Sequence, residues 1–184
     1  MGCRVSFEEH FVPMIDTNSK WKPVLEHLGA LWIHDGNKKR PYALLTSGKI
    51  SSGFFNASLV IEDPDLLRKA STDLLMNLSA SLTSTHGPSS SINRVVGSAN
   101  GATSIAYELA SQLQTKTGFT EKTSDGGMNM KRFNFEVGDL VLYAEDVLTT
   151  GGTTVKTIQA CRSAGASDFG SVSYTHLRAH ETVV

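Results

Sequence analysis

The sequence has few cysteines, almost no net charge and no long apolar stretch. Its only two cysteines, Cys3 and Cys161, form no CxxC pair and no disulfide framework, which indicates a reduced, cytoplasmic setting. The net charge of -1 excludes a global basic field. We therefore expect no nucleic-acid partner, and a phosphate-bearing ligand would need a local site. No apolar run is long enough to span a bilayer, so no membrane partner is expected.

The length and composition favour one globular domain. The 184 residues are 40% hydrophobic and 19% charged, as in proteins with a packed core. Apolar residues recur at helical spacing over residues 21–36, where Gly29 weakens the pattern and Gly36 ends it. A second helix is predicted over residues 63–82, with Asp63 as its cap and Pro64 in its first turn.

Strands and helices alternate in the rest of the chain. Residues 94–113 read as a buried strand, a glycine-containing turn and a helix, and residues 140–165 repeat this order. Between them, two strands are predicted around a polar turn at residues 125–127. Near-continuous apolar strands favour an α/β fold with a parallel sheet covered on both faces. In such sheets, ligands bind beyond the carboxyl ends of the strands.

The stretch "VLYAEDVLTTGGTT", residues 141–154, lies at one such strand end. Two acids, Glu145 and Asp146, follow an apolar strand, and Gly151 and Gly152 precede a helix whose free N–H groups suit a phosphate. Hydroxyl donors are added by Thr149, Thr150, Thr153 and Thr154. No Lys follows the glycines, so this is not a Walker A loop. Carboxylates can accept hydrogen bonds from sugar hydroxyls or lie near a magnesium ion on the ligand, which indicates a sugar phosphate. The alternative is a solvated acidic turn.

This stretch resembles the phosphoribosyl-pyrophosphate (PRPP) motif of type I phosphoribosyltransferases. The resemblance implies their fold, a central mostly parallel sheet with flanking helices and a small N-terminal hood. In that family, the acids contact the ribose hydroxyls and the loop holds the 5-phosphate. The PRPP-binding residues implied here are Lys49, Lys122, Glu145, Asp146, Val147, Leu148, Thr149, Thr150, Gly151, Gly152 and Thr153.

A second stretch, "LTSGKISSGFFN" at residues 45–56, is similar to the N-terminal element of orotate phosphoribosyltransferases. Lys49 offers a cation, and Phe54 and Phe55 offer a flat apolar surface for a planar anionic ring. The resemblance implies that Phe54, Phe55 and Thr149 bind orotate. The alternative is a turn followed by a pair of core phenylalanines.

Two further loops extend the resemblance. "VVGSANGATSIAYELA", residues 95–110, is similar to the pyrophosphate loop, although Ser98 and Asn100 depart from its commonest form; Gly101 permits close backbone approach. "FTEKTSDGGMNMKRF", residues 119–133, resembles the mobile catalytic loop. The implied catalytic residues are Lys122 and Asp146, with Lys122 stabilising the departing pyrophosphate. In the family this loop reaches the neighbouring subunit, which implies a homodimer. For residues 95–110 the alternative is a strand and helix that pack tightly through small residues. For residues 119–133 the alternative is a solvated hairpin.

The implied reaction transfers phosphoribosyl from PRPP to orotate, giving orotidine 5'-phosphate and pyrophosphate. Mg²⁺ is expected as the cofactor, bound through PRPP or pyrophosphate, with no protein residues assigned as metal ligands. Two alternatives stay open. One is a phosphoribosyltransferase for another base, and the other is a non-catalytic regulator of the same fold that senses PRPP or a nucleotide.

The resemblance ends after Ala166. The family would continue there into a buried strand with an Arg for the orotate carboxylate, but no position matches that Arg, and Arg178 is not assigned to the role. We expect no apolar strand in this region. The string "VSYTHLRAHET" resembles translated sequencing-adapter sequence. We therefore predict a phosphoribosyltransferase domain at residues 1–170 and a non-native tail at residues 171–184.

Overall fold

The centre of the molecule is a four-stranded parallel sheet. The computed structural model describes residues 18–44, 48, 50–81, 91–148 and 151–173. The strands follow the order β10-β9-β5-β6, and every neighbouring pair is parallel. Their bounds are β5 Arg94–Gly97, β6 Lys116–Phe119, β9 Leu140–Glu145 and β10 Ser167–Ser173. The predicted α/β fold with a parallel sheet is confirmed.

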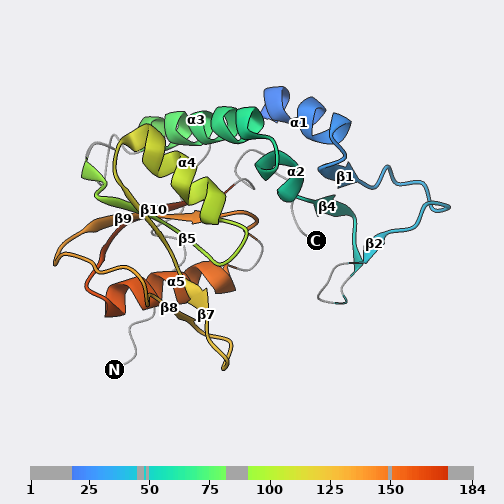
Figure 1. The fold of residues 1–184 in the computed structure, drawn as a ribbon. Coiled ribbons are helices and arrows are strands. Elements are labelled where there is room, and N and C mark those ends of the chain that lie inside the picture. Colours follow the sequence, from blue (N-terminus) through green and yellow to red (C-terminus); the bar gives the residue numbers. More distant parts are fainter. Residues whose placement is uncertain (1–17, 45–47, 49, 82–90, 149–150, 174–184) are drawn as a thin grey trace.

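Helices cover both faces of this sheet. In Figure 1, α3 and α4 lie above the sheet and α5 lies below it. Their bounds are α3 Pro64–Ser81, α4 Thr103–Leu113 and α5 Gly152–Ser163. Among the described residues, no helix is both long and apolar enough to cross a membrane.

Side chains of β9 are buried alternately on the two faces of the sheet. Leu142 and Ala144 belong to the larger core, together with residues of α3 and α4. Val141 and Tyr143 pack on the opposite side with Cys161 of α5. Both sets are at most 1% exposed, because the sheet is sandwiched between two helical layers. This double burial explains why β9 reads as a continuous apolar run.

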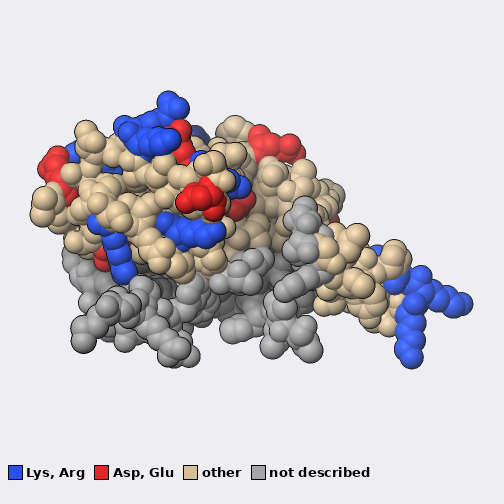
Figure 2. Space-filling view, turned by 90° about the horizontal axis from the view of Figure 1, so that it is seen from below, with Lys and Arg blue, Asp and Glu red and all other residues tan. Residues whose placement is uncertain are grey.

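The N-terminal part forms a small hood beside the main sheet. Its elements are α1 Asn18–His27, β1 Leu31–Ile33, β2 Ala43–Leu44, β3 Ile50–Ser51, β4 Gly53–Phe55 and α2 Ser58–Ile61. β1 pairs antiparallel with β4, and β2 pairs antiparallel with β3. The segment between β1 and β2 projects from the body, and its turn carries the exposed residues Lys38, Lys39 and Arg40. Figure 2 shows Lys and Arg side chains at the end of this projection.

The predicted helix over residues 21–36 is too long. α1 ends at His27, and Leu31 and Trp32 lie in β1, opposite Phe55 and Phe54. Gly29 has a φ of 69°, which turns the chain out of the helix. The spacing of the apolar residues fits a helix when it is taken alone. It carries no information about β4, the strand further along the chain that pairs with β1.

The start of α3 follows the prediction. The backbone N–H groups of Asp65 and Leu66 donate to Oδ1 of Asp63 at 2.9 and 3.1 Å. Asp63 therefore caps the helix, and Pro64 occupies the first helical position, where no backbone hydrogen bond is lost. This end of the helix is encoded locally.

A strand follows Ala166, although the sequence predicted no apolar strand there. β10 runs parallel to β9, from Ser167 opposite Leu140 to Ser173 opposite Glu145. Its pairing uses backbone N–H and C=O groups, which need no apolar side chains, so this Ser- and Gly-containing segment lacked a strand signal. The predicted domain boundary after residue 170 falls within β10, and the non-native origin of the later residues stays a prediction.

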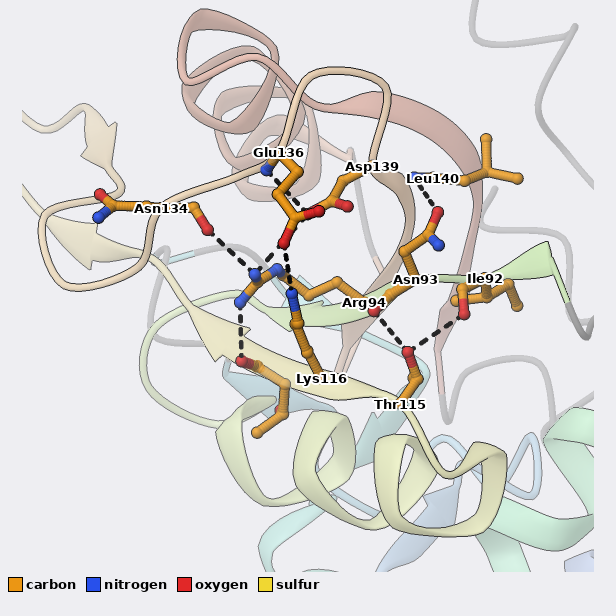
Figure 3. Close-up of polar contacts among 10 residues, drawn as sticks. Ile92, Asn93, Arg94, Thr115, Lys116, Asn134, Glu136, Asp139 and Leu140 are labelled. Carbon is orange, nitrogen blue, oxygen red and sulfur yellow. Dashed lines mark hydrogen bonds and ion pairs between the residues drawn. The ribbon is translucent and has the colours of Figure 1, made fainter.

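A buried ion pair lies at the amino edge of the sheet (Figure 3). Arg94, the first residue of β5, places Nη2 3.7 Å from Oδ2 of Asp139 and donates to the backbone oxygen of Asn134 at 3.0 Å. Its guanidinium carbon lies 5.0 Å from the centre of the Phe135 ring. Asp139 in turn accepts the N–H of Glu136. These contacts anchor the chain segment that leads into β9.

We expect Asp139→Ala to lower the free energy of unfolding by about 3 kcal/mol, because it leaves the buried Arg94 charge without its partner. Urea denaturation would measure the change. Glu136→Ala is the control: it removes only the exposed ion pair with Lys116 on the same segment and should leave the midpoint nearly unchanged. Equal effects of the two variants would contradict the assigned role of Asp139.

Candidate active site

The carboxyl edge of the sheet gathers polar side chains from three neighbouring strands. Ser98 directly follows β5, Thr120 directly follows β6, and Glu145 and Asp146 stand at the end of β9. Because the strands are parallel, these strand ends meet at one edge, where α5 also begins. This is the edge at which parallel α/β sheets bind ligands.

Glu145 is a buried acid, with only 6% of its surface exposed. Its Oε2 accepts a hydrogen bond from Oγ1 of Thr154 at 3.1 Å. Burial, followed by the hydrogen bond with Asp146, raises the pKa of Glu145 to about 7. The carboxyl group can therefore accept or donate a hydrogen bond near neutral pH.

Asp146 is less buried than Glu145 and touches the turn after β5. Its Oδ1 accepts the N–H of Val147 at 2.9 Å. A Cβ atom at Gly101 would overlap the Asp146 carboxylate, so only glycine fits at that position. Sequence reasoning predicted a close approach at Gly101, and in the structure that approach is made by Asp146.

The glycine-led start of α5 has the predicted form. Gly151 precedes the helix with a φ of 74°, and Gly152 and Thr153 are exposed in its first turn. Thr154 was expected among the hydroxyl donors for a ligand, but its hydroxyl is buried and donates to Glu145 instead. The reason is helical geometry, which turns Thr154 toward β9. Thr149 and Thr150 lie outside the described residues, and so does Lys49.

The structure brings together three buried hydroxyl groups, those of Ser98, Thr157 and Thr120, in one row. The sequence did not predict that they lie next to one another. Oγ1 of Thr157 lies 3.0 Å from Oγ of Ser98 and 3.2 Å from Oγ1 of Thr120. Two signals point to this row in the sequence. Ser98 and Thr120 each follow a strand, and Thr157 lies one helical turn after Thr154.

Comparisons with known proteins identify the family. No family model matches the chain. An orotate phosphoribosyltransferase from Caldicellulosiruptor bescii is 37% identical over 117 residues, which cover 63% of this chain and 56% of that protein. One from Chlorobaculum parvum is 31% identical over 157 residues, covering 85% of this chain and 73% of the relative. The chain belongs to the orotate phosphoribosyltransferase family.

A solved structure supports the fold of this family member. The orotate phosphoribosyltransferase from Aeropyrum pernix superposes with a TM-score of 0.62 at 24% identity, covering 83% of this chain and 79% of that one. The predicted type I phosphoribosyltransferase fold is therefore confirmed. The chain spans just over half of the length of the Caldicellulosiruptor bescii relative.

The predicted catalytic loop is an antiparallel hairpin that continues from β6. It consists of β7 Glu121–Lys122 and β8 Met128–Asn129. Lys122 is exposed and, within the described part of the chain, has no hydrogen-bonding or ion-pair partner. Nζ of Lys156 donates to the backbone oxygen of Gly126 at 2.7 Å, which ties the hairpin turn to α5. Lys122 is therefore free to meet a ligand.

The phenylalanine pair is divided between the surface and the core. Phe54 is 43% exposed, whereas Phe55 is 8% exposed and packs in the main core. The reason is strand alternation, because successive residues of β4 point to opposite faces. Only Phe54 therefore presents its ring for a ligand in this structure.

We expect Glu145→Gln to flatten the dependence of stability on pH. The folded-state pKa of about 7 lies above the ordinary value of 4.5, so the native protein loses stability as pH rises between these values. The amide of glutamine does not titrate in this range, so the fall in stability with rising pH disappears. The variant should gain about 1–3 kcal/mol relative to the native protein between pH 5 and pH 8, measured by urea unfolding.

Glu62→Gln, at an exposed site, serves as the control for that series and should run parallel to the native protein. Parallel curves for Glu145→Gln as well would show that Glu145 keeps an ordinary pKa in the folded protein.

Proposed function

We propose that the protein transfers the phosphoribosyl group of PRPP to orotate, giving orotidine 5'-phosphate and pyrophosphate. The observation that carries the proposal is the acid pair at the end of β9, set directly before a glycine-led helix in a member of this family. Acids suit ribose hydroxyls, and a helix N-terminus suits a phosphate. The acid pair alone, or the helix N-terminus alone, would suit many ligands. Side by side, they favour a ligand that has both sugar hydroxyls and a phosphate.

The PRPP site is proposed to extend from Glu145 to Thr153. The carboxyl groups of Glu145 and Asp146 would bind the ribose hydroxyls, beside Val147 and Leu148. The pKa of Glu145, near 7, lets its carboxyl group either donate to or accept from a hydroxyl. The segment from Thr149 to Thr153 would surround the 5-phosphate at the start of α5.

The chemistry is proposed to need no covalent nucleophile. The bond between ribose C1 and the pyrophosphate oxygen breaks, pyrophosphate leaves with the electron pair, and a ring nitrogen of orotate bonds to C1. The protein would position the reactants and stabilise charge, with Lys122 beside the departing pyrophosphate. Mg²⁺ carried by PRPP would offset further negative charge.

The residues near the acid pair fit a metal ion that arrives with its ligand. In the described ranges, no group of three or more His, Cys, Asp or Glu side chains is arranged to hold a metal ion. Asp146 keeps a partly exposed carboxylate, which suits an outer contact to a hydrated Mg²⁺ on pyrophosphate. We therefore assign the metal to the substrate complex.

Orotate is proposed to stack on Phe54, with Lys49 and Thr149 nearby. The exposed ring of Phe54 supports this role, and the buried ring of Phe55 acts as support for β4. A cytoplasmic homodimer is part of the proposal. The homodimer is supported by the apolar surface of the hood, where Tyr42, Leu44 and Ile50 are between 55% and 74% exposed.

The test of the function is PRPP- and Mg²⁺-dependent loss of orotate absorbance, with pyrophosphate release measured in parallel. Phe54→Ala should raise the KM for orotate about tenfold, because it removes the stacking surface. Turnover of a purine in place of orotate would favour a transferase for another base. Binding of PRPP without pyrophosphate release would instead favour the regulator.

Lys122→Ala should lower kcat about 100-fold while the KM for PRPP changes little, because the cation acts mainly on charge that develops as pyrophosphate leaves. Lys69→Ala, at an exposed position of α3, is the matched control and should turn over normally. An unchanged kcat for Lys122→Ala would remove Lys122 from the mechanism.

A further inference from the structure

The turn between β7 and β8 is held together by its own hydrogen bonds. The carboxylate of Asp125 accepts one from the hydroxyl of Thr123 and another from the backbone N–H of Gly127. The backbone N–H of Thr123 donates to Gly127 at 3.1 Å, and that of Gly126 donates to Thr123 at 3.0 Å. Because these bonds link every part of the turn, a contact to one of its residues restrains the whole turn.

The side chain of Lys156 ties this turn to α5. Its ammonium group donates to the backbone oxygen of Gly126 at 2.7 Å, which is the length of a charge-assisted hydrogen bond. Both residues are exposed, so the bond belongs to neither hydrophobic core. A groove of about 430 Å³ lies between the hairpin and α5, and its walls include Gly127, Met128 and Asn129 from the hairpin and Lys156, Gln159 and Ala160 from the helix. Direct packing between the two elements is therefore incomplete, and the hydrogen bond of Lys156 contributes to their spacing.

The restrained hairpin carries Lys122. This residue lies opposite Met128 in the antiparallel pair and directly precedes the turn. On the other side of the contact, α5 begins at Gly152, and Lys156 stands about one helical turn further along. The same helix therefore carries the proposed 5-phosphate site at its start and the anchor of the hairpin one turn later.

We propose that Lys156 is a positioning residue that holds the hairpin β7–β8 on α5 and so places Lys122 relative to the start of this helix. A hairpin that is already held loses less conformational entropy when Lys122 meets the departing pyrophosphate. The restraint is a property of the fold. Its effect on phosphoribosyl transfer rests on the proposed function.

Hydrogen exchange tests the restraint without any ligand. Lys156→Met removes the donor but keeps an unbranched side chain of similar helix propensity, whereas Lys156→Arg keeps a charged donor. The backbone amides of Thr123 and Gly126 report on the turn, because both are hydrogen-bonded within it. We expect Lys156→Met to speed their exchange about fivefold, the effect of one lost hydrogen bond, and Lys156→Arg to keep a rate close to the native one.

Two controls separate a local restraint from a general loss of stability. Lys69→Met removes the same charge from an exposed position of α3, on the opposite face of the sheet, and should leave both exchange rates unchanged. The urea midpoint of Lys156→Met should stay close to the native value, because Lys156 lies outside both cores. Native exchange rates in Lys156→Met, an equal increase in Lys69→Met, or a lower midpoint that accounts for the faster exchange would each overturn the proposal.

A double-mutant cycle tests whether Lys156 acts through Lys122. Lys156→Met alone should lower kcat about fivefold with little change in the KM for PRPP, and Lys156→Arg should keep kcat near the native value. In the Lys122→Ala background, Lys156→Met should cause no further loss, because the group that it positions is gone. An unchanged kcat in Lys156→Met, or the same loss in both backgrounds, would contradict a positioning role.

The two measurements also distinguish this inference from the proposed function. A native protein that fails to turn over orotate would refute the proposed function, while the exchange rates would still decide whether Lys156 holds the hairpin. Normal turnover together with native exchange rates in Lys156→Met would refute this inference alone.

Discussion

The buried carboxyl group of Glu145 is the constraint around which the site is arranged. An acid at the end of a doubly covered strand loses its water, and the loss must be compensated by hydrogen bonds from nearby groups. Thr154 supplies one from α5, which holds the start of this helix against the end of β9. The turn after β5 is held to the same strand end by a separate bond, in which the backbone N–H of Ser98 donates to Ala144 at 3.2 Å.

Charged side chains at the two edges of the sheet differ in whether the protein supplies a partner of opposite charge. At the amino edge, Arg94 meets Asp139, a backbone oxygen and an aromatic ring, and its charge is compensated within the protein. At the carboxyl edge, Glu145 and Asp146 carry the same sign and lack a cationic partner among the described residues. The first arrangement stabilises the fold, whereas the second leaves two neighbouring acids without a compensating cation among the described residues.

Sequence reasoning succeeded where the signal was local. The cap of α3, the hairpin β7–β8 and the order of strand, acids, glycines and helix all lie within short stretches of chain. It failed at β1 and β10, whose strand partners lie far away in sequence. It also could not predict that Phe55 is buried and Phe54 is exposed, because the buried face of β4 depends on what packs against the strand.

The sequence by itself determined the family resemblance and the residue types at the acid and glycine motif, since these depend on spacing within one segment. Tertiary structure alone decided that the hydroxyl of Thr154 is committed to Glu145 and that Ser98, Thr157 and Thr120 form one row. The physical reason is burial. A hydroxyl or carboxyl group has its partners and its pKa set by neighbours from other strands and helices, and only the packed sheet brings these together.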